Sequence, residues 1–183
     1  TAVAWKCIIL LCFYRQKGAV QMRQQNRNYY RNLKHYAERG NADEYIIYGS
    51  KRRNGCEICT FSGDPWRVEV VKKYLDNPKK VAFMREFNTY TGTYKGVEIT
   101  VTSTGIGAPS AAIAMEEMYE SGMQVAVRMG TVMSMQDDML GHFMIPIAAM
   151  RREGTSQTYV DLSYPAVADI ELVNVMNETV QQM

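Results

Sequence analysis

Residues 97–118, VEITVTSTGIGAPSAAIAMEEM, combine a strand, a glycine-rich turn and a helix in one continuous stretch. The residues predict a strand that ends at Ser103, and Pro109 near the start with Gly122 past the end predicts a helix over 108–121. Such a turn presents backbone N–H groups to an anion. A dinucleotide fingerprint is not favoured, because Ser110 stands where a third glycine is needed and the residues around Val125 are apolar. On this motif alone, a ligand-binding turn and a purely structural turn are equally supported.

The segments on either side continue the alternation of strands and helices. Strands are predicted over 56–61, 79–87, 89–103 (with a turn at 94–96), 123–130 and 142–150, and helices over 65–75 and 165–176. Nearer the N-terminus, we expect a short strand within 1–14, a helix-compatible stretch at 15–39, and a strand at 44–50 joined to 56–61 by an Asn54-Gly55 turn. This order predicts an α/β fold, a three-layer α/β/α domain with a central mixed sheet. The sheet should include 56–61, 97–103, 124–130 and 142–150, with the helix over 111–120 packed on one face.

The charge of the chain is unevenly distributed. The 183 residues carry a net charge of +2. Residues 1–62 hold eleven Lys and Arg against four Asp and Glu, a balance of +7, whereas residues 63–183 hold ten against fifteen, a balance of −5. We therefore predict a basic N-terminal extension at 1–43 and a separate domain at 44–183. The extension is either a solvated arm, which we favour, or a contact for nucleic acid or an acidic protein partner.

The composition is that of an ordinary globular protein, with 46% apolar and 22% charged residues. The longest apolar run, 7–14, is far shorter than the roughly 20 residues that cross a membrane. We expect a soluble, cytoplasmic protein with no membrane partner. Cys56 and Cys59 have C-x-x-C spacing, but Cys7 and Cys12 are too poorly spaced to complete a zinc ribbon. We interpret all four as buried free thiols and predict no metal site.

Two further segments, SGDPWRV at 62–68 and VRMGT at 127–131, hold candidate ligand-binding residues. In the first, Gly63 lets the backbone approach a ligand and Arg67 could face an anion, although a capped helix start is the simpler alternative. In the second, Arg128 stands in an otherwise apolar strand, where an unpaired charge is unfavourable. Arg128 must therefore meet either a carboxylate or a bound anion, and the carboxyl end of a strand is where α/β sheets bind ligands.

Four ordered segments resemble the nucleoside phosphorylase family, specifically its uridine-phosphorylase-like branch. They are GDPWRV at 63–68, REFNTYTGTYKGVEITVTSTGIGAPSAAIAMEE at 85–117, RMGT at 128–131 and EGTSQTYVDLSYPAVADIE at 153–171. The resemblance runs from about Glu44 to the C-terminus and implies a nucleoside phosphorylase-like fold. It also implies that phosphate attacks the anomeric carbon of a nucleoside while the base departs, with inorganic phosphate as co-substrate and no cofactor.

The resemblance also implies roles for particular residues. The phosphate-binding residues of the family match Gly63, Arg67, Arg85, Arg128 and Thr131. The substrate pocket would be lined by Thr104, Gly105, Ile106 and Met133. Guanidinium groups match phosphate oxygens in pairs and offset their charge. Because the counterpart of Arg85 reaches into a neighbouring subunit, the resemblance implies a homodimer or a higher homo-oligomer.

Three departures from the family pattern leave the activity open. Val132 and Met133 follow Thr131, where the family usually has a glycine two positions on; Ile46 or Ile47 replaces a histidine that the family contributes across the dimer. The chain ends at Met183, before the family's base-recognising Gln/Arg pair and ribose-holding Met-Glu segment. We expect phosphorolysis of a pyrimidine nucleoside, uridine-like, to free base and ribose 1-phosphate. The alternatives are a catalytically inactive relative that serves as a structural or interaction component of a larger assembly, and a fragmentary or frameshifted gene product.

Overall fold

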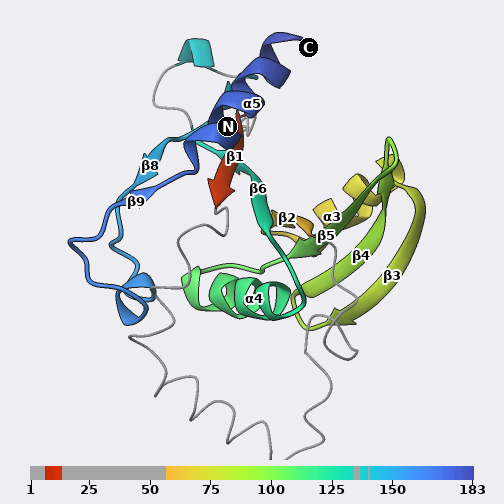
Figure 1. Cartoon of the computed structure of the whole chain (residues 1–183), viewed down its shortest axis with the longest axis horizontal. Helices are drawn as coiled ribbons and strands as arrows, with labels where there is room; N and C mark the ends of the chain where they lie inside the picture. The colour runs from red at the N-terminus through yellow and green to blue at the C-terminus, as the bar shows by residue number, and fades with distance from the viewer. Residues whose placement is uncertain (1–6, 14–56, 134–136, 140) are drawn as a thin grey trace, which may run out of the picture.

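A computed structural model describes residues 7–13, 57–133, 137–139 and 141–183 (Figure 1). Within this part of the chain, seven strands form one sheet in the order β3-β4-β5-β2-β6-β1-β7. They are β1 (Cys7–Phe13), β2 (Ile58–Ser62), β3 (Asp76–Met84), β4 (Phe87–Tyr94), β5 (Val97–Ser103), β6 (Val125–Val132) and β7 (Phe143–Met144). β2 is parallel to its neighbours β5 and β6, whereas β3, β4 and β5 form an antiparallel meander. β1 is antiparallel to β6 and parallel to β7, so the sheet is mixed, as predicted.

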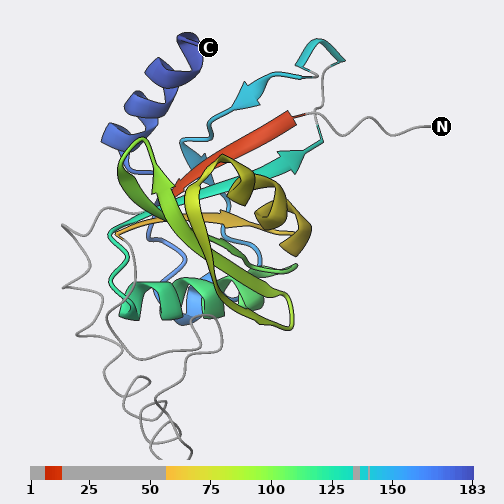
Figure 2. The same ribbon diagram turned by 90° about the vertical axis from the view of Figure 1, so that its right-hand side faces the viewer.

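Helices cover both faces of this sheet (Figures 1 and 2). In the described residues, the α-helices are α3 (Pro65–Val71), α4 (Ala108–Glu120) and α5 (Ile170–Gln181), and the 3₁₀ helices are η2 (Lys72–Tyr74), η3 (Asp137–Met139) and η4 (Ser156–Thr158). On one face, Met118 of α4 packs with Phe61 and Phe87. On the other face, Val68 of α3 packs with Tyr90. Phe87 and Tyr90 are three residues apart in β4 and therefore point to opposite faces. The predicted α/β/α layers, with the 111–120 helix on one face, are confirmed.

Two tight turns shape the meander. The β4–β5 turn is formed by Lys95 and Gly96, both with positive φ (50° and 81°), at the predicted place. The β3–β4 turn is formed by Arg85 and Glu86, and Arg85 has a φ of 54°. The strand predicted over 79–87 is therefore wrong at these two residues. The sequence MREF contains no glycine, proline or asparagine to mark the turn.

The C-terminal third differs most from its predicted form. The single strand predicted over 142–150 is wrong: β7 ends at Met144, and β8 (Ala148–Ala149) pairs with β9 (Ala166–Val167) in a separate two-stranded sheet. Pro146, which has no N–H to donate, lies between the two short strands and accounts for the break. The helix predicted over 165–176 begins instead at Ile170, where the Asp169 carboxylate accepts a hydrogen bond from the Leu172 N–H (2.9 Å).

The strand predicted within 1–14 is present as β1, whereas 15–39, 44–50 and the Asn54-Gly55 turn lie outside the described residues. The division into a basic extension and a domain therefore stays a prediction. Cys59 is a buried thiol, as predicted, and its Sγ lies 3.9 Å from Met118 Sδ. In the described ranges, no three His, Cys, Asp or Glu residues are grouped to hold a metal ion. Nor does any helix there have the length and apolar character needed to cross a bilayer.

Candidate functional site

The carboxyl ends of three parallel strands meet at one edge of the sheet. β2 runs parallel to β5 on one side and β6 on the other, so Ser62, Ser103 and Val132 end their strands at the same edge. Thr104 connects two of the loops that follow: its backbone N–H (2.7 Å) and its Oγ1 (3.2 Å) both donate to the Ser62 carbonyl oxygen. Edges of this kind are where α/β sheets bind ligands. The three segments singled out in the sequence therefore converge on a position suited to a ligand.

Helix α3 begins at this edge and brings Arg67 to it. The Asp64 side chain caps the helix by accepting a hydrogen bond from the Trp66 N–H (2.8 Å), and Pro65 occupies the first turn. Arg67 follows and is half-buried; its Nη2 donates to Thr131 Oγ1 over 2.9 Å. This hydrogen bond joins the start of α3 to the end of β6 and orients the guanidinium group at the edge.

Arg128 lies at the same edge, between two glycines. A Cβ atom on Gly130 would lie 2.9 Å from Arg128 Nη1, and one on Gly63 would lie 3.4 Å from Arg128 Nη2. The guanidinium group therefore occupies space that is open because Gly63 and Gly130 have no side chain. Burial lowers the pKa of Arg128, and the positive charge of Arg67 lowers it further. Two cationic groups that repel each other at a half-buried edge form a site whose free energy an anion would lower.

The sequence left open whether Arg128 meets a carboxylate or an anion. Among the residues that the structure describes, no carboxylate is paired with Arg128 or with Arg67. Of the charged groups in this part of the chain, it is another cation, Arg67, that perturbs the pKa of Arg128. The repulsion between the two arginines, with no structural ion pair to offset it among the described residues, therefore favours an anion site at this edge.

As a test of this edge as an anion site, with inorganic phosphate as the probe, we expect Gly130→Ala to weaken binding at least about tenfold and to change the free energy of unfolding little. The backbone at Gly130 is not in the left-handed region, so alanine fits it, but the methyl group displaces the end of the flexible Arg128 side chain. A charge-assisted hydrogen bond is worth about 1.5–3 kcal/mol, and about 1.4 kcal/mol is a factor of ten in affinity. Calorimetric titration with inorganic phosphate, alongside thermal denaturation, measures both quantities. Unchanged affinity would show that Arg128 does not need this space to bind phosphate.

The other predicted site residues occupy two kinds of environment. Thr104 is 1% exposed, and the Gly105 carbonyl oxygen would lie 3.7 Å from a Cβ on Gly63, so both belong to the edge. Ile106 (99% exposed) and Met133 (67% exposed) stand in solvent. Arg85 is exposed in the β3–β4 turn. The structure thus brings together Gly63, Arg67, Thr104, Gly105, Arg128 and Thr131, and leaves the side chains of Arg85, Ile106 and Met133 at the surface.

A polar group beneath the 104–107 turn was missed in the sequence. The Ser110 hydroxyl lies 2.5 Å from the Thr104 carbonyl oxygen and 2.9 Å from Glu86 Oε1. The pKa of Glu86 is lowered, first by the N–H of its own backbone and then by the Ser110 hydroxyl. Ser110 therefore links the turn to the β3–β4 hairpin. In the sequence, Ser110 stands out only as the residue that replaces a third glycine. Its position in the first turn of the predicted helix is the signal that could have marked it as a contact for the preceding turn.

Comparison with known proteins identifies the family of the chain. Residues 57–183 match the Phosphorylase superfamily. The uridine phosphorylase of Thermococcus kodakarensis is 41% identical over 150 residues, which cover 80% of this chain and 54% of that protein. The guanosine phosphorylase of Halorubrum lacusprofundi is 40% identical over 116 residues, covering 63% of this chain and 48% of that protein. The chain thus spans about half the length of these relatives.

Solved structures show the same likeness. A crystal structure of uridine phosphorylase from Vibrio fischeri superimposes with a TM-score of 0.65 at 33% identity, covering 71% of this chain and 55% of that one. Purine nucleoside phosphorylase from Toxoplasma gondii, in complex with immucillin-H, has a TM-score of 0.68 at 23% identity, covering 76% and 57%, and so shares the fold. Since the match to the superfamily extends from Glu57 to the last residue and includes every segment that forms the arginine-lined edge, the chain belongs to the phosphorylase superfamily.

Proposed function

We propose that this protein is a nucleoside phosphorylase that uses inorganic phosphate to cleave a pyrimidine nucleoside of the uridine type into free base and ribose 1-phosphate. The observation that carries the proposal is the convergence of Arg67 and Arg128, from separate elements, at the carboxyl edge of the sheet. With Gly63 and Thr131 beside them, the two guanidinium groups supply donors for the oxygens of one phosphate ion. Relatives from Treponema pallidum, Haemophilus influenzae and Escherichia coli are 35–41% identical over about half their length. They bear the name uridine phosphorylase, which supports a pyrimidine nucleoside as the substrate.

The proposed chemistry needs a fixed phosphate ion. One phosphate oxygen attacks C1′ of the ribose, the C1′–N bond breaks, and its electron pair leaves with the base, which then takes up a proton. Positive charge develops on the sugar as this bond breaks, and the bound phosphate offsets it. Arg67 and Arg128 would hold the nucleophile in position, which removes most of the entropic barrier to its attack.

We further propose a homo-oligomer in which Arg85 of one copy completes the phosphate site of another. Two observations support it. Arg85 is exposed in the β3–β4 turn, and Ser103 Oγ donates to the Glu86 carbonyl oxygen (2.6 Å), so this turn lies at the ligand edge. In a two-fold dimer, each Arg85 would enter the site of the other copy. For the basic residues 1–43, a solvated arm stays the favoured interpretation, and contact with a protein partner is the alternative.

The direct test is phosphorolysis by the purified chain, with uridine and guanosine compared in the presence and absence of phosphate. We expect phosphate-dependent release of uracil, faster than that of guanine, together with ribose 1-phosphate. Arg128→Ala should release neither base, whereas Arg152→Ala, which removes an exposed arginine outside the site, should keep the activity. Phosphate binding without base release would favour the catalytically inactive relative. The absence of both phosphate binding and base release would overturn the proposal.

A further inference from the structure

A buried asparagine connects the start of α3 to the sheet. Asn88 is the second residue of β4, and its side chain is 1% exposed. Its backbone N–H donates to Ser103 Oγ (2.8 Å), so Asn88 stands beside the carboxyl end of β5. Asn88 shares a face of β4 with Tyr90, the face that α3 covers. It therefore lies at the ligand edge, under the first turn of the helix that carries Arg67.

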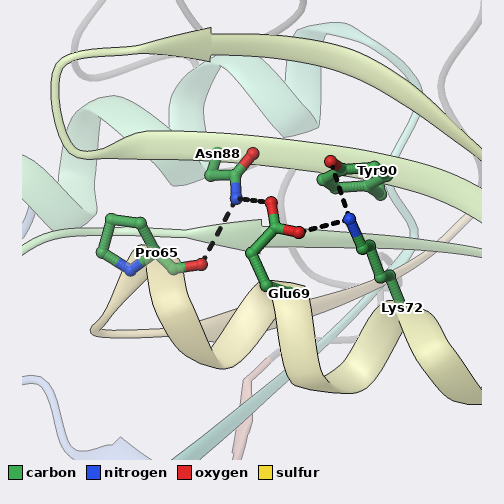
Figure 3. Close-up of polar contacts among 5 residues, drawn as sticks. All are labelled: Pro65, Glu69, Lys72, Asn88 and Tyr90. Atoms are coloured by element: carbon green, nitrogen blue, oxygen red, sulfur yellow. Dashed lines mark hydrogen bonds and ion pairs between the residues drawn. The ribbon is translucent and has the colours of Figure 1, made fainter.

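Both contacts of the Asn88 amide nitrogen are with α3 (Figure 3). Nδ2 donates to the Pro65 carbonyl oxygen over 3.3 Å and to Glu69 Oε1 over 2.8 Å. Figure 3 shows the amide nitrogen directed toward both acceptors and the amide oxygen directed away from them. Since Arg67 lies midway between Pro65 and Glu69 in the helix, Asn88 holds the chain on both sides of it.

A second contact holds the same helix further along. The Glu69 carboxylate forms an ion pair with Lys72, whose Nζ also donates to the Tyr90 hydroxyl (3.1 Å) and lies 4.5 Å from the centre of that ring. The hydrogen bond from Lys72, and then that from Asn88, lower the pKa of Glu69 from 4.5 to about 2. Glu69 is therefore ionised at neutral pH, and its contact with Asn88 is charge-assisted.

The Asn88 amide oxygen is less well satisfied. Oδ1 is buried and accepts no hydrogen bond from the described residues. A buried, unpaired acceptor is unfavourable, so a residue with an apolar side chain would be the better choice if packing alone mattered. The contribution of Asn88 therefore comes from the two hydrogen bonds that its amide nitrogen donates, and not from its amide oxygen.

We propose that Asn88 is a positioning residue for phosphate binding: its two donors hold the first turn of α3 so that Arg67 reaches the end of β6. The inference rests on the proposed phosphate site. α3 has only seven residues, and so short a helix depends on tertiary contacts for its stability and direction. If the Pro65 carbonyl or Glu69 is released, the helix can rotate and Arg67 loses its 2.9 Å hydrogen bond to Thr131.

Asn88→Asp tests this inference by replacing only the donating NH₂ group. Aspartate presents an oxygen to the Pro65 carbonyl and to the Glu69 carboxylate, which are both acceptors, and so turns two attractions into repulsions. We expect phosphate affinity, measured by calorimetric titration, to fall at least about tenfold. Asn77→Asp is the matched control, because Asn77 is exposed and its φ of 50° suits either residue. It should bind phosphate like the unchanged protein.

Two further measurements separate positioning from general destabilisation. In an Arg67→Lys background, Asn88→Asp should leave phosphate affinity almost unchanged, because both changes act through the guanidinium group of Arg67. In phosphorolysis, the KM for phosphate should rise and the KM for uridine should not. If Asn88→Asp fails to fold, Asn88→Thr replaces it, since a β-branched residue suits the strand and keeps one donor; a smaller loss, again dependent on Arg67, is then expected.

The possible results are distinguishable. Affinity equal to that of the unchanged protein, or an equal loss in the Arg67→Lys background, overturns the role of Asn88 and leaves the proposed function standing. A protein that binds no phosphate even with Asn88 intact overturns the site itself, and the inference with it.

Discussion

Arg128→Ala is expected to abolish the stabilisation of this protein by inorganic phosphate. A ligand at one hundred times its dissociation constant stabilises the folded state by about 2.7 kcal/mol. For a chain of this length, that corresponds to a rise in Tm of roughly 5–10 °C. The alanine variant should show almost no rise, because it lacks the guanidinium group that Gly63 and Gly130 accommodate. Thermal denaturation over a series of phosphate concentrations measures the effect.

In phosphate-free buffer, by contrast, Arg128→Ala should unfold at nearly the same temperature as the unchanged protein. Burial and the charge of Arg67 both lower the pKa of Arg128, so the ionised side chain is unfavourable in the absence of an anion. Removing it relieves that repulsion and offsets the lost packing, and Tm without phosphate should therefore change little. Arg152→Ala, which alters an exposed arginine, serves as the control and should keep the full phosphate response. A full response in Arg128→Ala would contradict the site.

The segments that form the arginine-lined edge could be recognised in the sequence because their signals are local. Each of the segments 62–68, 103–107 and 127–131 follows or ends a recognisable strand, and Arg128 is conspicuous in an apolar run. The order of the strands is a different matter, because it depends on pairing between residues far apart. That β2 lies between β5 and β6, which brings the three segments together, follows from the structure and from no single segment.

The errors have equally specific causes. Over 142–150 the apolar composition predicts one strand, but a single residue, Pro146, breaks it. Arg85 and Glu86 form a turn without any residue typical of turns, because Glu86 is held by Ser103 and Ser110 from outside the hairpin. Asn88 stands among the polar residues of NTYTGT, where nothing in the sequence distinguishes it. Its contacts with Pro65 and Glu69 depend on the position of α3, which only tertiary structure defines.

Of the substitutions proposed for this protein, Gly105→Ala should cause the largest loss in the free energy of unfolding, for two reasons that can be separated. Gly105 has a φ of +69°, which disfavours a side chain by about 1–2 kcal/mol. A Cβ atom there would lie 2.5 Å from Glu86 Cγ, 3.0 Å from Glu86 Cβ and 3.1 Å from Ser110 Oγ, and overpacking of this kind costs about 1–3 kcal/mol. We expect a loss of about 3 kcal/mol in the free energy of unfolding, measured by denaturant titration. Gly154→Ala isolates the backbone effect, because Gly154 has a φ of +85° and nothing within 4 Å of its Cβ position; equal losses in the two variants would contradict the predicted contact with Glu86.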